Sequence, residues 1–307
     1  MVNKMNIEKK EIKRKARGLG FFVMSHQLFF QFGATVMLIV IGCVSAMLGL
    51  EHLEDTALYI ASDLMQLIAG VFFLVFYLVK RKKIKSVPMM KSKCTSKLFV
   101  KCLITIFSVN MILSLIEMFL TVFTGFSLSV PMKGIENMNP VLLFATVAVF
   151  PAIVEELMFR GVLYRYLRGH GVQFAAISSS IIFGLVHLNF LQFIFSTIMG
   201  VVCCYIYEAT GKLRYSMLLH LLNNSILVLF NILPITGAVS AFVQIALGIM
   251  SLVAVIAYLV YRKKKHGTLK TDISVDTKKS CLYLFTSIPM LIFVLACLGV
   301  CVYMSFC

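Results

Sequence analysis

Long apolar stretches alternate with short polar segments along the whole chain. A helix needs about 20 predominantly apolar residues to cross the hydrocarbon core of a bilayer. Most of the stretches meet this length; the fifth and sixth are short and are separated by almost no polar sequence. The predicted spans are 21–50, 57–79, 98–124, 140–165, 174–188, 190–208, 213–232, 238–260 and 281–306.

The composition supports the same interpretation. Of the 307 residues, 60% are hydrophobic and 14% are charged, and the mean hydropathy is +0.94. Soluble domains are about 45–50% apolar and about 25% charged, so this chain could not cover itself with polar surface. The sequence therefore predicts an all-α fold, a polytopic transmembrane helical bundle of about eight to nine spans, and excludes a soluble enzyme and a disordered chain.

The net charge of +16 comes from basic clusters between the apolar stretches. On a soluble protein this charge would suggest nucleic acid, but here the clusters indicate orientation by the positive-inside rule and contact with anionic lipid. With the N-terminus in the cytoplasm and alternating spans, every Lys and Arg except Lys133 falls on the cytoplasmic side. We expect a multi-pass protein of the cell membrane with a cytoplasmic N-terminus, a lipid bilayer as partner, and no nucleic acid.

The loops are too short to fold as separate domains, so the predicted divisions follow the membrane. They are a basic cytoplasmic N-terminus (1–20), N-terminal transmembrane helices (21–124), a catalytic core (140–260), a basic cytoplasmic loop (261–280) and a C-terminal transmembrane helix (281–307).

Ionisable side chains inside a span cost roughly 2.5–3.5 kcal/mol each on insertion scales, so they are candidates for function. The fourth span carries Glu155, Glu156 and Arg160. Glu156 and Arg160 are four residues apart and can form an ion pair on one helix face. Glu155 then faces another sector without that partner, which suits a general base. The alternative is that all three residues only hold helices together.

Two more spans carry polar groups at helical spacing. In the fifth, Phe183 and His187 are four residues apart; alone, His187 would more often be a buried neutral histidine bonded to a carbonyl. In the seventh, His220 and Asn224 share a face, and Asn224 can orient a histidine, donate to an oxyanion or join helices. A patch with Gln27 at the start of the first span is interpreted as packing. A carboxylate, two imidazoles and an amide together suit peptide-bond hydrolysis inside a membrane.

Other intramembrane protease chemistries lack their signatures. The HExxH pattern of zinc proteases and the Gly-x-Ser-x-Gly elbow are absent. Aspartyl catalysis needs two intramembrane aspartates, and Asp63 is the only Asp near a span.

The three patterns, Glu155-Glu156-x-x-x-Arg160, Phe183-x-x-x-His187 and His220-x-x-x-Asn224, resemble the motifs of the CPBP family, in the same order. This is the family of CAAX prenyl endopeptidases and bacteriocin-processing or immunity proteins, also called Abi. The resemblance covers about 140–260 and implies a core of the eight-helix type with an internal cavity.

The resemblance also implies roles. Glu155 would activate water with His187 beside it, His220 and Asn224 would stabilise the oxyanion, and Glu156 and Arg160 would support them. No cofactor is expected; the alternative is zinc at Glu155, His187 and His220, since a Glu and two His can hold zinc with an open position.

The predicted function is an intramembrane endopeptidase that uses glutamate-activated water to process a bacteriocin-like, signalling or lipidated peptide. The alternative is a non-catalytic membrane protein that gives immunity to a bacteriocin or regulates a membrane partner. A transporter is less favoured, because neither repeated halves nor broken Gly/Pro helices are visible.

Overall fold

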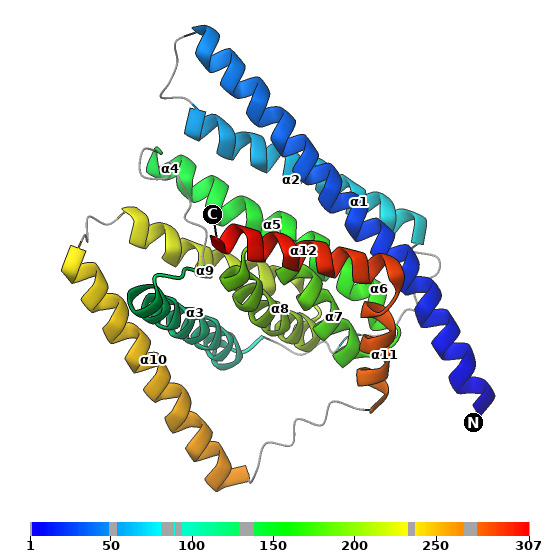
Figure 1. Cartoon of the computed structure of the whole chain (residues 1–307). Helices are drawn as coiled ribbons and strands as arrows, with labels where there is room; N and C mark the ends of the chain where they lie inside the picture. The colour runs from blue at the N-terminus through cyan, green and yellow to red at the C-terminus, as the bar shows by residue number, and fades with distance from the viewer. Residues whose placement is uncertain are drawn as a thin grey trace.

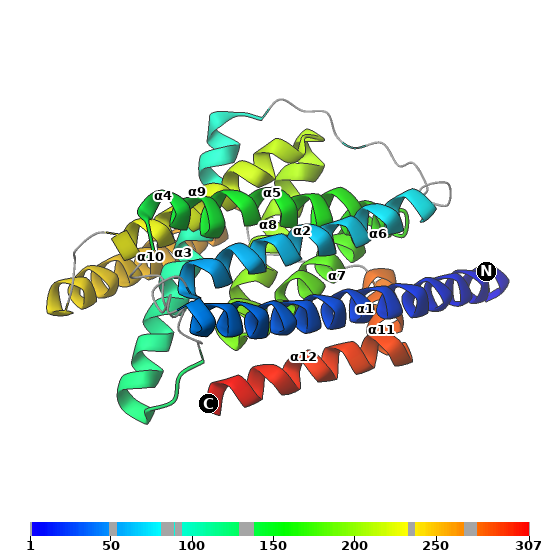
Figure 2. The ribbon, with the colours of Figure 1, turned by 90° about the horizontal axis from the view of Figure 1, so that it is seen from above.

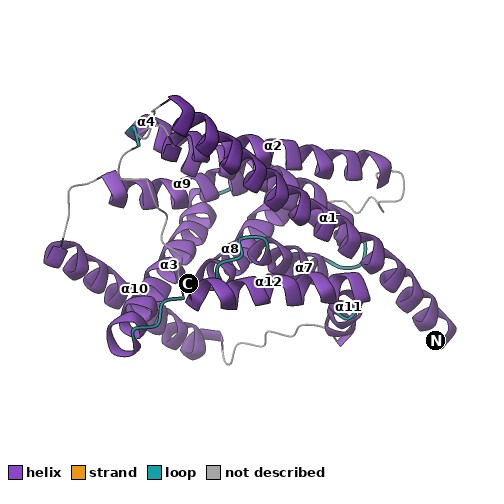
Figure 3. Cartoon of the chain, turned by 45° about the horizontal axis from the view of Figure 1, so that its top comes forward, coloured by secondary structure: helices purple, strands orange, loops and turns teal. Residues whose placement is uncertain are grey.

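The computed structural model describes residues 2–48, 54–80, 89, 94–128, 138–232, 237–266 and 275–306. Every regular element within these ranges is a helix (Figure 3). The predicted all-α bundle is confirmed. The elements are α1 (Val2–Leu48), α2 (Glu54–Lys80), α3 (Ser96–Thr124), α4 (Pro140–Leu143), η4 (Phe144–Val149), α5 (Phe150–Glu156), η5 (Leu157–Tyr164), α6 (Arg165–Arg168), α7 (Val172–Leu185), α8 (Phe190–Thr210), α9 (Leu213–Ile232), α10 (Gly237–His266), α11 (Val275–Phe285) and α12 (Ile288–Phe306).

The centre of the bundle is the antiparallel pair α7 and α8, against which η5 and α9 pack. The long helices α1 and α2 run side by side along one flank, and α10 packs against α3 on another (Figure 1). Helix α12 lies beside α1, as the view from above shows (Figure 2). Helices far apart in the sequence therefore enclose the segment that carries the paired glutamates.

Close packing of α7 on α8 depends on two glycines. A Cβ atom on Gly200 would lie 2.8 Å from both Cβ and Oγ of Ser180, and one on Gly184 would meet Thr197 and the carbonyl of Phe193. Small residues let helix backbones approach closely in membranes, where packing rather than water drives helix association. The two glycines thus place the α7–α8 pair within reach of the charged groups on the neighbouring helix.

Six of the helices are long and apolar enough to cross a membrane, among the residues that the structure describes. They lie within Ile12–Leu48, Tyr59–Lys80, Ser96–Thr124, Pro140–Arg168, Phe190–Thr210 and Ile288–Ser305. The chain is a multi-pass membrane protein. Shorter apolar helices, Val172–Leu185 and Phe242–Ile256, account for part of the difference from the nine predicted spans.

Several predicted boundaries differ from the structure. The segment 281–306 is two helices, α11 and α12, because Pro289 has no N–H to donate to the Phe285 carbonyl and the helix cannot continue through it. Within 261–280, residues 261–266 continue α10 and residues 275–280 belong to α11, whereas 267–274 lie outside the described residues. Lys133 also lies outside them.

Two of the basic segments that were predicted to share one membrane face, 1–20 and the end of the fourth span, contact each other. Lys15 Nζ of α1 lies 2.8 Å from His170 Nε2 in the turn after α6. At the same turn, Arg168 pairs with Glu208 near the end of α8, and the Tyr164 hydroxyl donates to the same carboxylate at 2.6 Å. This contact agrees with the prediction that these two segments share a face; which face of the membrane that is in the cell stays a prediction.

Candidate active site

Glu155 and Glu156 end α5, a short α-helical stretch between the π-helical segments η4 and η5. Such wider turns often occur at functional sites. Pro151 lies in the first turn of α5 and has no N–H for the Val147 carbonyl four residues earlier. Asn224 Nδ2 on α9 donates to that carbonyl at 3.0 Å. The interrupted helix is therefore tied directly to α9.

Glu156 and Arg160 form the predicted ion pair. Glu156 Oε1 lies 2.7 Å from Arg160 NH1, and the two side chains are 0% and 1% exposed. The guanidinium also stacks over the Phe183 ring, with 4.4 Å from Cζ to the ring centroid. Phe183 of the second motif thus covers the charged pair of the first motif.

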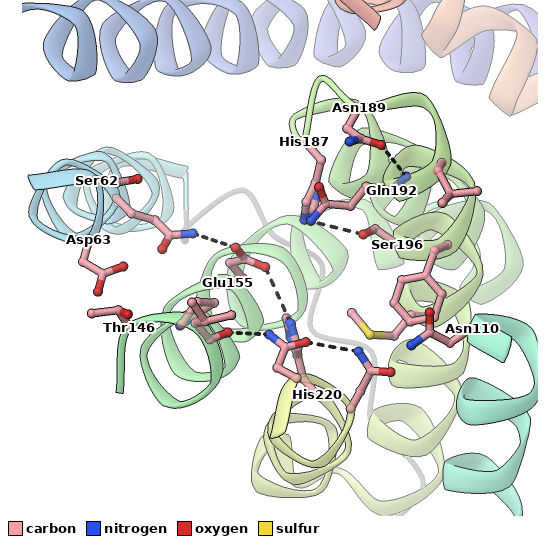
Figure 4. Close-up of a pocket in the computed structure, with 18 of the residues that line it drawn as sticks. Ser62, Asp63, Asn110, Thr146, Glu155, His187, Asn189, Gln192, Ser196 and His220 are labelled. Carbon is pink, nitrogen blue, oxygen red and sulfur yellow. Dashed lines mark hydrogen bonds and ion pairs between the residues drawn. The ribbon is translucent and has the colours of Figure 1, made fainter. Parts of the chain in front are cut away.

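Glu155 faces a different sector, as predicted, and keeps 13% of its side chain exposed. Its Oε1 accepts a hydrogen bond of 2.6 Å from Gln66 Nε2 on α2. Its Oε2 lies 3.8 Å from His220 Nε2 (Figure 4). Adjacent glutamates therefore occupy different environments: one is sealed in an ion pair and the other reaches a cavity.

His220 lies between the two carboxylates. Its ring is 3% exposed, with Nδ1 3.2 Å from Glu156 Oε1 and Nε2 directed at Glu155. An ionised carboxylate can only accept, so the proton on this side belongs to Nδ1 of His220. The Nε2 atom of His220 then points toward Glu155 and the cavity.

His187 lies one residue beyond the C-cap of α7, which ends at Leu185, so the predicted helix 174–188 ends three residues too late. The ring Nδ1 lies 2.8 Å from the Phe183 carbonyl, and Nε2 lies 3.5 Å from Ser196 Oγ. A carbonyl accepts only, so Nδ1 carries the proton and Nε2 presents a lone pair. His187 therefore makes the carbonyl hydrogen bond expected of a buried neutral histidine, and its Nε2 nitrogen is still available to a ligand.

These groups line one cavity of about 430 Å³. It lies between α2, α3, α5, the α7–α8 turn and α9, and Figure 4 shows Glu155, His187 and His220 around it. The volume falls in the range of small-molecule and substrate pockets. All four predicted catalytic residues, Glu155, His187, His220 and Asn224, line this cavity, and the supporting Glu156 and Arg160 lie behind it.

Residues 137–226 match the family model described as type II CAAX prenyl endopeptidase, Rce1-like. A protein of Bacillus subtilis (strain 168) named "Putative membrane peptidase YdiL" is 29% identical over 97 residues. The resemblance to the CPBP family is confirmed. The aligned segment is 31% of this chain and spans about two fifths (39%) of the Bacillus protein. No solved structure matches the chain significantly.

The three motifs also contain the residues of the zinc alternative. Among the described residues, no group of three or more His, Cys, Asp or Glu side chains could hold a metal ion. Zinc needs ligand atoms about 2.0–2.2 Å away. Glu156 engages Nδ1 of His220 and the Phe183 carbonyl engages Nδ1 of His187, so each ring keeps Nε2, the nitrogen that a metal would bind. The zinc alternative at Glu155, His187 and His220 stays a prediction, and we assign no step to a metal.

The cavity also contains polar residues that belong to none of the three motifs. Asp63 and Gln66 of α2 and Asn110 of α3 line it, and all three come from outside the matched segment. Asn223, 2% exposed, donates to Asn224 Oδ1 at 3.1 Å. In the sequence, each of these residues is a polar position inside an apolar stretch. Such a position does not by itself show which other helix the side chain faces.

Proposed function

We propose that this CPBP protein is a membrane-embedded endopeptidase in which Glu155 activates water. The observation that carries the proposal is the contrast between the two glutamates. Glu156 is neutralised by Arg160 and closed off, whereas Glu155 reaches a cavity that also holds His187 and His220. A carboxylate within reach of water and two imidazoles is the arrangement that general-base hydrolysis requires.

In the proposed reaction, the water oxygen bonds to the carbonyl carbon of the scissile peptide while Glu155 Oε2 takes a water proton. The same water donates its other hydrogen to His187 Nε2. The oxyanion is stabilised by the second Nδ2 hydrogen of Asn224 and by His220 Nε2 when the ring carries both protons. The C–N bond then breaks, and the amine leaves with the proton that Glu155 received.

We propose that the substrate is a bacteriocin-like, signalling or lipidated peptide, cut at the cell membrane without a metal. The support is the CAAX endopeptidase family match together with a cavity built among the membrane-crossing helices. The distribution of Lys and Arg along the sequence, together with the contact of Lys15 with the turn after α6, supports a cytoplasmic N-terminus.

Comparative peptidomics tests the proposal. Cells lacking the protein are complemented with wild type, Glu155→Gln or Glu117→Gln at matched membrane levels, and membrane and medium peptides are compared. Glu117 is a matched control, because it is an acid within α3 that does not line the cavity. We expect a peptide end that appears with wild type and Glu117→Gln and disappears with Glu155→Gln.

A product that forms equally with Glu155→Gln would refute the general-base role. If no peptide end depends on wild type while Glu155→Gln still restores the cell's phenotype, the protein acts without cleavage. Immunity to a bacteriocin or regulation of a membrane partner would then replace the proteolytic function.

A further inference from the structure

Two glutamines from the N-terminal helices reach the catalytic elements. Gln66 of α2 and Gln27 of α1 both lie outside residues 137–226, the segment that matches the CAAX endopeptidase family. Gln66 Nε2 donates to Glu155, and Gln27 Nε2 donates to the carbonyl of Val186. Each amide therefore ends beside a different part of the proposed catalytic machinery.

The Gln66 contact fixes the orientation of the Glu155 carboxylate. At 2.6 Å it is a short hydrogen bond from a neutral amide to an acid oxygen, a class stronger than neutral pairs when the acid is ionised. It occupies Oε1 and leaves Oε2 toward His220 and the cavity. Without it, the Glu155 side chain could rotate about its terminal torsion, which is a broad one.

The Gln27 contact holds the turn that carries His187. Val186 caps the end of α7, where carbonyls lose their helical partners, and Gln27 supplies one at 3.2 Å. Two residues later, Leu188 has φ 54°, the left-handed region that costs a residue with a Cβ about 1–2 kcal/mol. The turn is thus strained, and the 8% exposed Gln27 side chain is one of the groups that keep it in place.

We infer that Gln66 and Gln27 are positioning residues that join helices α1 and α2 to the catalytic site. This inference rests on the proposed function. Gln66 orients Glu155 so that one carboxylate oxygen is available to water. Gln27 stabilises the turn at the end of α7 and thereby the position of His187. The patch containing Gln27 was interpreted from the sequence as packing. Through this contact, Gln27 also affects the placement of His187.

The test uses the full-length protein, purified and reconstituted in liposomes. The substrate is a synthetic peptide spanning the cut that depends on Glu155 in the peptidomics comparison. Gln66→Met and Gln27→Met keep side-chain length and remove the amide donor. Leu64→Met on α2 and Leu38→Met on α1 place the same side chain at positions 48% and 54% exposed, as controls.

We expect each glutamine variant to lose about 10- to 100-fold in kcat, the size of effect that a small misplacement of a reacting group produces. The KM should stay within about twofold, because neither glutamine is assigned to substrate binding. Gln66→Asn, which keeps an amide on a shorter side chain, should recover part of the loss.

Wild-type kcat in Gln66→Met or Gln27→Met would overturn the inference for that residue while the proposed function stands. A raised KM with unchanged kcat would also overturn it, because the glutamine would then bind substrate. If Gln66→Met does not accumulate, Gln66→Asn alone decides, and wild-type kcat in that variant counts against positioning. Absence of any Glu155-dependent cut would refute the proposed function, and this inference with it.

Discussion

The buried ion pair of Glu156 and Arg160 allows a quantitative prediction. Both side chains are essentially unexposed, and Glu156 Oε1 receives NH1 at 2.7 Å and His220 Nδ1 at 3.2 Å. Removing one charge leaves the other buried without compensation, a change that typically costs about 3–5 kcal/mol. Glu156→Gln or Arg160→Met should each fall in this range. Removing both charges should cost much less, because replacing a whole buried pair is often close to neutral.

A loss of about 4 kcal/mol raises the unfolded-to-folded ratio by nearly a thousandfold, since each 1.4 kcal/mol is tenfold. By the scaling for domains of comparable size, it lowers the Tm by about 8–16 °C. In the double variant Glu156→Gln/Arg160→Met, the amide introduced by the first change can still accept from His220, and the thioether side chain introduced by the second can pack on Phe183. We expect the Tm of the double variant to lie closer to that of wild type than to that of either single variant.

The chain provides its own probe for the assay. Cys203, Cys204, Cys297 and Cys301 are buried free thiols in the folded protein. A maleimide that fluoresces on reaction with thiols therefore reports unfolding in detergent, over a background from the exposed Cys43 and the partly exposed Cys94 and Cys281. Single variants that melt within about 2 °C of wild type would refute the claim that this pair is buried and coupled. A double variant as unstable as the singles would show that the loss is not due to an unpaired charge.

Two further predictions concern contacts that hold the bundle together, and both use the same unfolding assay. Gly200→Ala should lower stability by about 1–3 kcal/mol, because the added Cβ would lie 2.8 Å from Ser180. Ser180→Gly should restore much of that loss, and no restoration would place the strain elsewhere. Glu208→Gln should cost about 1–3 kcal/mol, since it weakens contacts to both Arg168 and Tyr164. Tyr164→Phe removes only one of these two contacts and should cost less. A loss of stability equal to or larger than that of Glu208→Gln would contradict a contribution from Arg168.

The parts of the site that follow from local spacing were predictable from the sequence. Glu156 and Arg160 are four residues apart on one helix, so their pairing needs no knowledge of the rest of the fold. The helical character of the chain follows similarly from its long apolar stretches. The C-terminal break was available as well, because Pro289 prevents a single helix over 281–306.

The contacts that complete the site join residues far apart in the chain, and spacing says nothing about them. Gln66 and Glu155 are 89 residues apart, and Gln27 and Val186 are 159 apart. Which face of α2 meets α5 depends on how all the helices pack, not on either helix alone. The same holds for Asn224, whose bond to Val147 depends on Pro151 freeing that carbonyl in another helix.

One residue of helix rotation separates the two glutamates, and it gives them different chemistry. Successive residues on an α-helix point about 100° apart. Glu156 therefore turns toward Arg160 and His220, where its Oε1 is shared by both and no water reaches it, so it cannot accept a proton from a substrate water. Glu155 turns toward α2 and the cavity, where its nearest fixed contact is the amide of Gln66. Exchanging their positions would require rotating the helix away from the Arg160–Phe183 stack, so the buried pair sets which glutamate can serve as the proposed general base.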